Sequence, residues 1–403
     1  MSLIGRAFRN QTTDTPITTS HELQAFLDVY GAWSTTSGVA VSPATAMACA
    51  AVSAAVGLLS ESAGQLPLNI YRRLTPRGKD KAREHPVWSV LHDSPNAWQN
   101  PFEYREQKTL HLALWGNAYS IKVRSPRGEL MELLPIHPSR VEVKQDERWR
   151  VTYKIKGPDD TIATFPRDRV FHIRDRSING YEGRPRILDG RDTIGLALSA
   201  ERWGGQLFGN SARPAGLLST DENLTDDQID RLISTWKQAH GGSNALGTAV
   251  LDGGMKWSPL VMNNTDAQFL ETRKFQIAEV ARLYRVPPHM LGDLEKATFS
   301  NVEHMGIQFV KFTLLPWLKR WESAINDQLL DNDPELFAEF NVNAFERGDL
   351  ASRTVHYSAG IRDGYYSPND VLEKENENPV DGGDEYRRAE SIHGPTPEGV
   401  TPA

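Results

Sequence analysis

The part of this sequence that comes nearest to a catalytic motif is a pair of glycines at the spacing of a phosphate-binding loop. Gly242 and Gly247 are separated by four residues, as in the P-loop of nucleotide-hydrolysing proteins. That loop continues with Lys and then Ser or Thr, whereas this chain continues with Thr248 and Ala249. Because no lysine is in place to meet the β- and γ-phosphates, the sequence predicts no nucleotide-hydrolysing site here.

Two groups of acidic residues have the right types for a metal site but the wrong setting. Asp159 and Asp160 are adjacent, and Asp331, Asp333 and Glu335 alternate along a second segment. Carboxylates at such spacings can coordinate a divalent cation. Gly and Pro precede the first group, while Asn and Pro interrupt the second, which is typical of solvent-exposed turns. We expect turns at both places and no metal site.

The other candidates for nucleophilic or acid–base chemistry are isolated. Cys49 is the single cysteine, which excludes an internal disulfide framework and suits a reducing compartment. His172, His289 and His304 belong to no motif, and the sequence contains neither His-Glu-x-x-His nor Gly-x-Ser-x-Gly. Isolated histidines are more often packed or capping residues than ligands. We therefore expect no catalytic residue, no metal and no cofactor.

The composition is that of an ordinary soluble protein with two or three domains. The chain has 403 residues, of which 39% are hydrophobic and 24% charged. Its 45 basic and 52 acidic residues give a formal charge of −7. A protein that grips DNA needs a basic footprint, because neutralising phosphates supplies most of the affinity. The charge therefore disfavours a DNA reader, although mild repulsion would suit a surface past which DNA slides.

One uncharged stretch imitates a membrane segment. Residues 38–60 carry no charge, and Arg6 and Arg9 precede them, as in a signal peptide. The stretch consists mainly of Ala, Ser, Val, Gly and Thr, with Pro43 near its start, so its hydrophobicity is too weak for stable insertion. We expect a soluble helix that packs tightly against its neighbours.

Alternating residues predict a β-rich block in the first half of the chain. Tyr119, Ile121 and Val123 alternate with polar residues, which is the period of a half-buried strand. Pro and Gly within residues 125–128 predict a hairpin turn. Several short antiparallel strands with turn signals indicate a small barrel or sandwich. Further short strands are expected at residues 66–74, 141–143, 151–155 and 170–173.

Long helices dominate the second half. Residues 188–209, 266–284 and 301–330 have helical patterns, and Pro316 predicts a kink in the third helix. The first two helices bracket a small α/β insert, which indicates a stalk with a head. Residues 1–28 are expected to be loose, and the acidic tail from residue 381 to be disordered. Shorter helices are expected at residues 85–91, 101–114, 225–240, 350–359 and 368–375.

Several of these segments together resemble the portal proteins of tailed bacteriophages, in the HK97-type family of siphophages. The most specific segment, DAQFLETRKFQIAEVARLYRVPPHMLGD at residues 266–293, resembles the second stem helix of that family and its return to the wing. The resemblance spans roughly residues 30–383 and covers most of the chain. It is also carried by residues 53–73, 116–143, 208–220, 300–330 and 349–372.

The resemblance implies an α+β portal fold with a β-rich wing, long stem helices, a small α/β clip insert, a kinked helix above a tunnel loop, and a helical crown. Two departures concern local stem and crown contacts. Arg184 stands where the family has a small residue, and Asn369-Asp370-Val371 where it has Asn-Glu and then an arginine. The implied regions are an arm at 1–28, the wing at 29–187, stem helix 1 at 188–211, the clip at 212–262, stem helix 2 at 263–286, the wing return and tunnel loop at 287–300, the kinked helix and wing at 301–343, the crown at 344–380, and the tail at 381–403.

The resemblance also implies a function. Portal subunits form a ring, usually of twelve copies, at one capsid vertex of the virion after assembly in the host cytoplasm, and DNA is packaged and ejected through that ring. The implied partners are other copies of the chain, the large terminase subunit, the head–tail adaptor, the major capsid protein or scaffold, and double-stranded DNA without sequence specificity. The motor hydrolyses ATP and the portal does not, and no membrane partner is expected.

Two segments are the candidate sites. The chain must reverse direction between the second and third long helices, where the family has its channel loop, and one lysine flanked by two acids favours a weak contact with sliding DNA. The predicted channel loop consists of Gly292, Asp293, Leu294, Glu295, Lys296, Ala297, Thr298, Phe299 and Ser300. Acidic residues in the clip insert would steer a basic partner. The predicted docking residues are Asp221, Glu222, Asp226, Asp227 and Asp230.

Three alternatives stay open at this point. The portal of a domesticated gene-transfer particle would have the same sequence features. A membrane-associated channel component would rest on residues 38–60 alone. An enzyme acting on DNA, such as a nuclease or the terminase itself, would need clustered carboxylates or a complete P-loop, and the sequence has neither.

Overall fold

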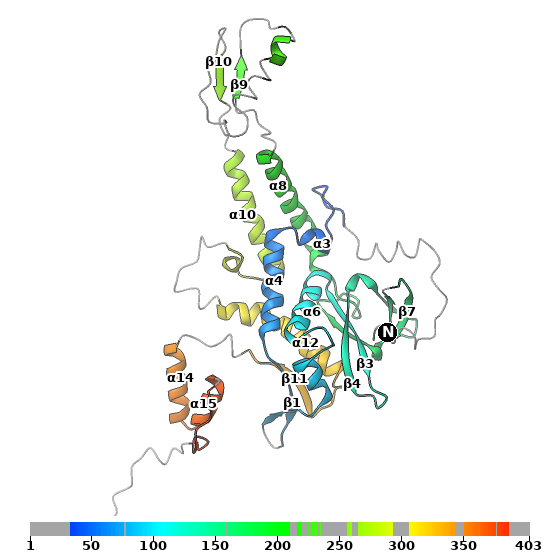
Figure 1. The fold of residues 1–403 in the computed structure, drawn as a ribbon, viewed down its shortest axis with the longest axis vertical. Coiled ribbons are helices and arrows are strands. Elements are labelled where there is room, and N and C mark those ends of the chain that lie inside the picture. Colours follow the sequence, from blue (N-terminus) through cyan, green and yellow to red (C-terminus); the bar gives the residue numbers. More distant parts are fainter. Residues whose placement is uncertain are drawn as a thin grey trace, which may run out of the picture. The chain divides into compact units, whose positions relative to one another are not determined.

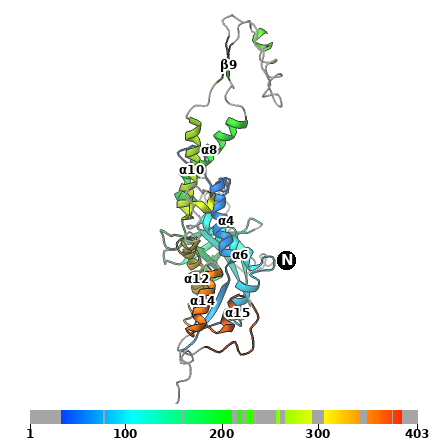
Figure 2. The same ribbon diagram turned by 90° about the vertical axis from the view of Figure 1, so that its left-hand side faces the viewer.

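The computed structural model describes residues 33–75, 78–157, 159–209, 216–219, 225, 227–231, 234, 256–259, 265–292, 306–342, 350–375 and 377–386. Figures 1 and 2 show its helices and strands. The chain divides into two compact units, one of residues 1–64 and 95–296 and the other of residues 65–94 and 297–403. Residues 65–94 therefore group with the second half of the chain rather than with the rest of the expected wing.

Two small antiparallel sheets form the β-rich part of the first unit. One sheet has the order β4 (Leu130–Ile136), β3 (Asn117–Arg124), β8 (Val170–Arg174), and the other the order β5 (Val141–Gln145), β6 (Val151–Lys156), β7 (Ile162–Pro166). Of the barrel or sandwich expected from the sequence, the two separate sheets with one shared core correspond to a sandwich. The core includes Tyr119, Ile121, Leu134, Val141, Tyr153, Ile155, Phe165 and Val170.

The hairpin between β3 and β4 follows from its turn residues. Ser125 N–H donates to Glu129 O at 2.8 Å, and Gly128 N–H donates to Ser125 O at 2.9 Å. Gly128 has a φ of 87°, which glycine adopts without steric cost. The predicted turn at residues 125–128 is confirmed, and it fixes the register of the two strands.

The expectation that β3 is half-buried is wrong. Ser120 and Lys122 are as buried as the apolar residues between them, because β3 is the central strand of its sheet and helix α6 (Pro101–Trp115) covers its second face. Tyr104 and Ser120 hydroxyls are 2.7 Å apart, and Lys108 Nζ donates to Tyr119 O at 2.5 Å. Ser120 therefore contacts a side chain of α6 instead of water.

The uncharged stretch at residues 38–60 is not one helix. Ser42 and Thr45 form a capping box that starts the short helix α3 (Pro43–Ala46), and α4 (Ala50–Gln65) begins after it. Val52, Val56 and Leu59 of α4 are completely buried, which agrees with the predicted packed helix. Among the described residues, no helix is both long enough and apolar enough to span a membrane.

Two long helices lie side by side in the first unit, as both views show (Figures 1 and 2). Helix α8 (Arg191–Gly209) follows the short α7 (Arg186–Asp189) after a break at Gly190, and α10 (Thr265–Tyr284) ends before the short helix η5 (Pro288–Leu291). The two predicted helices are confirmed, the first with a later start. In the intervening sequence, β9 (Gly216–Ser219) pairs antiparallel with β10 (Lys256–Pro259).

The second unit contains a three-stranded antiparallel sheet in the order β11 (Leu336–Phe340), β1 (Leu68–Arg73), β2 (Lys79–Lys81). Helix α12 (Leu315–Gln328) packs on β11, where Phe340 N–H donates to Glu322 Oε1 at 3.0 Å. Strand β11 was not predicted. The helix expected at residues 85–91 is observed as α5 (Pro86–Trp88) followed by the π-helix η1 (Ser89–Asp93).

The irregularity predicted at Pro316 lies just before it. Residues Phe309–Leu314 form a π-helix, η6, and regular α-helix begins at Leu315. Proline has no N–H and its ring clashes with the carbonyl four residues earlier, so the preceding turn widens. The proline then occupies the first turn of α12, where a missing donor costs little.

Two helices close the described chain, α14 (Leu350–Arg362) and α15 (Pro368–Glu375). Arg353 binds Glu375 at 2.9 Å and so joins them. The expected disorder from residue 381 is wrong for its first residues, since Asn369 Nδ2 donates to Asp384 Oδ1 at 2.9 Å and Asn369 N–H donates to Gly383 O at 2.9 Å. Residues 387–403 lie outside the described residues.

Candidate functional site

Most of the predicted site residues lie outside the described part of the chain. Of the channel loop, the structure describes Gly292. Gly292 has a φ of 89°, and its N–H donates to His289 O at 3.2 Å. This conformation ends η5 and turns the chain. Of the docking residues, Asp227 and Asp230 are described, and both are exposed on a helical turn. The predicted residues outside the description are Asp293, Leu294, Glu295, Lys296, Ala297, Thr298, Phe299, Ser300, Asp221, Glu222 and Asp226.

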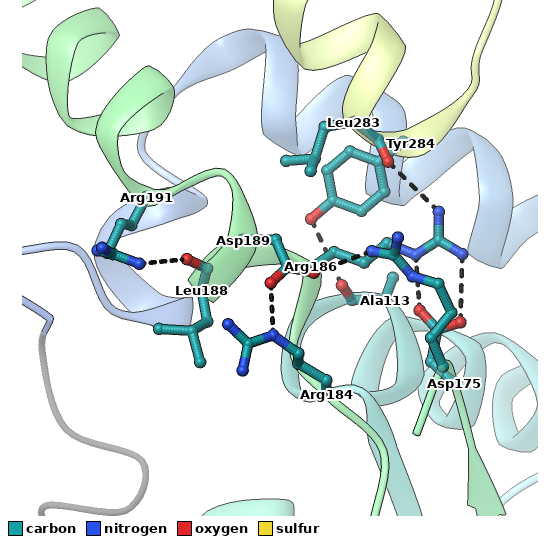
Figure 3. A network of polar contacts seen from close by, with 10 residues as sticks. Ala113, Asp175, Arg184, Arg186, Leu188, Asp189, Arg191, Leu283 and Tyr284 are labelled. Atoms are coloured by element: carbon teal, nitrogen blue, oxygen red, sulfur yellow. Dashed lines mark hydrogen bonds and ion pairs between the residues drawn. The ribbon is translucent and has the colours of Figure 1, made fainter. Parts of the chain in front are cut away.

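A buried ion pair joins the β-rich sandwich to the start of the long helices. Asp175 follows β8, and Arg186 begins α7, the short helix that leads into α8. Arg186 Nε donates to Asp175 Oδ2 at 2.6 Å and Nη2 donates to Oδ1 at 3.2 Å (Figure 3). The arginine side chain is 7% exposed and the carboxylate 0%. A two-point pair at such burial fixes the direction in which α7 leaves the sheet.

The same arginine also reaches the end of α10. Arg186 Nη1 donates to Leu283 O at 3.3 Å, which satisfies a carbonyl of the last helical turn. The adjacent Tyr284 is fully buried and donates its hydroxyl to Ala113 O of α6 at 3.4 Å (Figure 3). Burial raises the pKa of Tyr284, so its hydroxyl keeps its proton and remains a donor. One end of each long helix is therefore fixed to the same small region.

Arginines also surround Asp189 at the end of α7. Arg184 Nε donates to one carboxylate oxygen at 2.5 Å and Arg176 Nη2 donates to the other at 3.1 Å. Arg184 is the residue for which the family pattern has a small side chain. It pairs with Asp189 (Figure 3). These three side chains are partly exposed, so the pairing adds little stability compared with the buried pair. We call the region of these ion pairs the helix base; it consists of Asp175, Arg176, Arg184, Arg186 and Asp189.

Two glycines make the junction between α6, β3 and the following loop possible. Gly116 ends α6 with a φ of 72°, and a Cβ there would lie 2.6 Å from the carbonyl carbon of Arg184. A Cβ on Gly183 would lie 2.0 Å from Gly116 O. Side chains at these positions would push the backbones apart, so the sequence places glycine at both.

Asn117 connects this junction to the sandwich core. Its Nδ2 donates to Gly183 O at 2.7 Å and to Trp115 O at 3.1 Å, and its Oδ1 accepts from Gly183 N–H at 2.7 Å and contacts His172 Nε2 at 2.9 Å. Since Asn117 Oδ1 accepts, His172 carries its proton on Nε2. Its Nδ1 then accepts from Tyr153 OH at 3.1 Å. His172 is a packed core residue, as the sequence predicted.

The pKa of His172 is well below its usual value. Burial is the main cause, and the nearby positive charges of Arg174 and Arg167 act in the same direction. The imidazole is therefore neutral at physiological pH, in agreement with its hydrogen bonds.

A cleft of about 240 Å³ lies between the start of α4 and the long helices. Its apolar lining is mostly alanine, and its polar lining is Cys49, Glu201, Arg273 and Gln276. Burial raises the pKa of Cys49, which disfavours the reactive thiolate. Glu201 pairs with Arg273 at 3.5 Å. In the described residues, no three potential metal ligands lie close enough together to bind an ion.

Sequence reasoning missed the Asp175–Arg186 pair and the Asn117 network. Both depend on irregular segments, where neither the period of a helix nor that of a strand marks a residue as buried. The signal that was present is the density of glycine and arginine in residues 174–186, which is typical of a closely packed, charge-paired turn.

Comparison with known proteins gives consistent results. The family model described as phage portal protein matches residues 50–376. The portal protein of Enterobacteria phage HK97 is 31% identical over 335 residues, which cover 82% of this chain and 78% of that protein. A probable portal protein of Streptomyces phage phiC31 is 33% identical over 368 residues, which cover 87% and 80%. In a structure of the neck of a native gene transfer agent particle, computed with C12 symmetry, one chain matches with a TM-score of 0.60 at 22% identity, covering 94% of this chain and 100% of that chain.

Proposed function

Since the chain belongs to the phage portal protein family, we propose that it is the subunit of a ring at one capsid vertex, through which DNA is packaged and later ejected. The observation that carries the proposal is the pair of long helices α8 and α10, which Asp175 and Arg186 fix at one end. This pair occurs in a chain that is 31% identical to a portal protein over 82% of the chain. Such a helix pair, repeated around an axis, forms the wall of a channel.

Exposed apolar side chains on the helices support assembly into a ring. Leu196 and Trp203 of α8 and Phe275 of α10 are 50%, 42% and 59% exposed, respectively. A single subunit leaves these side chains in water, whereas a neighbouring copy buries them at a favourable free energy of about 25 cal/mol per Å². Contacts that repeat head-to-tail close into a ring, and we propose twelve copies.

The two predicted sites keep their proposed roles within this function. Residues 292–300 contact DNA in the channel without holding it, because one lysine per subunit makes a weak and exchangeable phosphate contact. The acidic residues of the clip, of which Asp227 and Asp230 are exposed, dock the large terminase subunit during packaging and the head–tail adaptor afterwards. The terminase supplies ATP hydrolysis, and the portal itself is not an enzyme.

The same proposal places the ring in the virion, next to the major capsid protein, after assembly in the host cytoplasm. A portal of a gene-transfer particle is the second candidate, because a chain from such a particle matches the fold over 94% of this chain. The two differ in cargo. Sequencing the DNA inside particles that contain this portal would show phage genomes in the first case and random host fragments in the second.

The test is the assembly state of the purified chain, measured by mass photometry and negative-stain microscopy. We expect a ring with a central hole and a mass of about 540 kDa, twelve times the 45.1 kDa of the chain. Phe275→Asp should shift the population towards monomers. Trp149→Asp, an equally apolar and even more exposed position on the β5–β6 hairpin, is the control and should leave the ring intact. A parent protein that stays monomeric at all concentrations and salts would exclude the proposal.

In particles, two further variants test the sites within the ring. Deleting residues 294–298 should spare assembly but shorten the DNA retained in the head. Replacing Asp227 and Asp230 by Lys should spare assembly but weaken terminase binding at low salt. Parent-like retention or parent-like terminase affinity would show that the respective segment has another role.

A further inference from the structure

One segment of this acidic chain is strongly basic. From residue 72 to residue 84 the sequence has more Lys and Arg residues than acidic ones, whereas the whole chain has more acidic than basic residues. The segment covers the end of β1, the turn and strand β2 in the second unit. The net charge of the whole chain therefore does not describe this segment, whose own charge is positive.

The strand register gathers three of these cations on one face of the sheet. Arg73 is directly opposite Lys79, and Tyr71 is directly opposite Lys81. Residues that face each other across antiparallel strands, and residues two apart along a strand, point to the same side. Phe337 of β11 lies opposite Tyr71, and Glu339, two residues further along β11, lies on the same face and pairs with Lys79. We call Tyr71, Arg73, Lys79, Lys81 and Phe337 the basic face.

Aromatic rings support two cations of the basic face, Arg73 and Lys79, and Glu339 also pairs with Lys79. Arg73 Cζ lies 4.9 Å from the centre of the Phe337 ring, and Lys79 Nζ lies 4.4 Å from the centre of the Tyr71 ring. Tyr71 and Phe337 stack on each other with their centres 5.6 Å apart. In these contacts the charged groups lie against the aromatic rings and stay exposed to water.

The acidic residues near the hairpin are already occupied. Glu339 pairs with Lys79. Glu84 pairs with Arg72 at 3.0 Å, and Glu335 pairs with the same arginine at 3.8 Å. Within the described residues no carboxylate pairs with Arg73 or Lys81, and both side chains are exposed. Within the described residues, the cations of the basic face outnumber the carboxylates that pair with them, so the face keeps a net positive charge.

This arrangement costs stability, because like charges directly across a strand pair repel each other. Arg73 opposite Lys79 is such a pair. An anion that bridges the cations would remove the repulsion. Lys79 and Lys81 are about 7 Å apart along β2, a span over which one strand of DNA presents two phosphates. We propose that the basic face binds the phosphate backbone of double-stranded DNA.

The aromatic rings indicate the backbone rather than the bases. Single-strand binding surfaces expose aromatic faces on which bases stack. Here the rings of Tyr71 and Phe337 are half-buried, stacked on each other and covered by cations, so they offer no free face to a base. The basic face makes few contacts per subunit, and its affinity for DNA depends on salt and on repetition around the ring.

The inference rests on the proposed function, which brings DNA to this protein. Its test is fluorescence anisotropy of the assembled ring with a labelled duplex of about 30 base pairs, between about 50 and 200 mM salt. The variant Arg73→Gln/Lys79→Gln/Lys81→Gln should bind at least about tenfold more weakly at the lower salt. The logarithmic salt slope should also fall in magnitude, by about 0.9 for each phosphate that the variant no longer neutralises. The matched control is Lys144→Gln/Arg148→Gln/Arg150→Gln on the β5–β6 hairpin, which should bind as the parent does.

Two results would overturn the inference while leaving the proposed function intact. One is a ring whose DNA affinity and salt slope are the same in the triple variant and in the parent. The other is a parent ring that binds a poly-glutamate peptide through the basic face but shows no salt-dependent binding of duplex DNA, which would assign the face to an acidic protein. Failure of the parent to form a ring, measured first by mass photometry, would instead overturn the proposed function.

Discussion

The helix base and the basic face treat charge in opposite ways. At the helix base, Arg186 is matched by Asp175, and Asp189 is bound by two arginines. On the basic face, Arg73 and Lys79 are directly opposite each other. Glu339 pairs with Lys79, and no described carboxylate forms an ion pair with Arg73. The first region is buried at its centre, whereas the cations of the second are exposed.

The difference follows from the cost of removing a charge from water. A buried ion without a partner loses several kcal/mol of solvation, so Arg186 can be buried because both carboxylate oxygens of Asp175 accept hydrogen bonds from it. An exposed cation keeps its water, and an unmatched one is tolerated at a small cost. Matched charges at a buried site thus indicate a structural role, whereas unmatched charges held in register leave room for a ligand.

The largest expected effect is at the helix base. Asp175→Ala leaves the Arg186 guanidinium buried without its counter-ion, and we expect a loss of about 3–5 kcal/mol in the free energy of unfolding. Urea unfolding at matched protein concentration measures it, since assembly adds to the apparent stability.

The control for that variant is Arg184→Ala, which breaks the partly exposed pair with Asp189 and should cost no more than about 1 kcal/mol. Equal losses in the two variants would mean that burial does not distinguish these ion pairs, and the comparison between matched and unmatched charge would lose its basis.

A smaller effect is expected from pH at the core network next to the helix base. Because the pKa of His172 is lower in the folded state than the unfolded value of about 6.5, the unfolded chain binds a proton that the folded chain does not. Stability is therefore complete above about pH 6.5 and is lost as the pH falls towards the folded pKa, by about 1.4 kcal/mol per unit.

The variant His172→Gln removes that proton uptake. Its unfolding free energy should fall less steeply than that of the parent between about pH 6 and pH 5, by about 1.4 kcal/mol per unit. Carboxylates contribute equally to both proteins, so the difference isolates the histidine. Identical slopes would mean that His172 accepts a proton without penalty in the folded state.

Local signals were sufficient for much of this fold. The α+β portal fold and the family expected from the sequence are confirmed, as are the turn at residues 125–128 and helix α15. Each of these elements is specified by neighbouring residues, such as Gly128 in the turn or Pro368 at the helix start. Strand β11 was missed because five residues with weak alternation pair with β1, which is distant in the sequence, and no local pattern encodes that pairing.

Burial was harder to predict than secondary structure. Lys122 has the position of a solvent-facing residue in an alternating strand, yet it is buried. The partnership of Asp175 and Arg186 depends on how an irregular loop folds back, which neither helical nor strand periodicity reveals. At the predicted sites, Gly292 ends η5 and Asp227 and Asp230 are exposed, and the roles of both segments stay predictions.

The smallest expected effect concerns the basic face alone. Arg73→Thr removes the repulsion with Lys79 but also the packing against Phe337, and threonine is a good strand former. The two effects oppose each other and are of similar size, so we expect the unfolding free energy at low salt to change by less than about 0.5 kcal/mol.

Salt separates the two contributions, because it screens the repulsion between exposed cations much more than it weakens packing against a ring. Raising the salt from about 50 to about 500 mM should therefore stabilise the parent more than Arg73→Thr, measured as the shift in urea midpoint at fixed protein concentration. An equal response of both proteins would mean that Arg73 and Lys79 do not repel each other. The charge of the basic face would then not lower the unfolding free energy, and a ligand would have no repulsion to relieve. A larger response of the parent, together with weaker DNA binding by the variant, would show that the same arginine destabilises the free subunit and stabilises its complex with DNA.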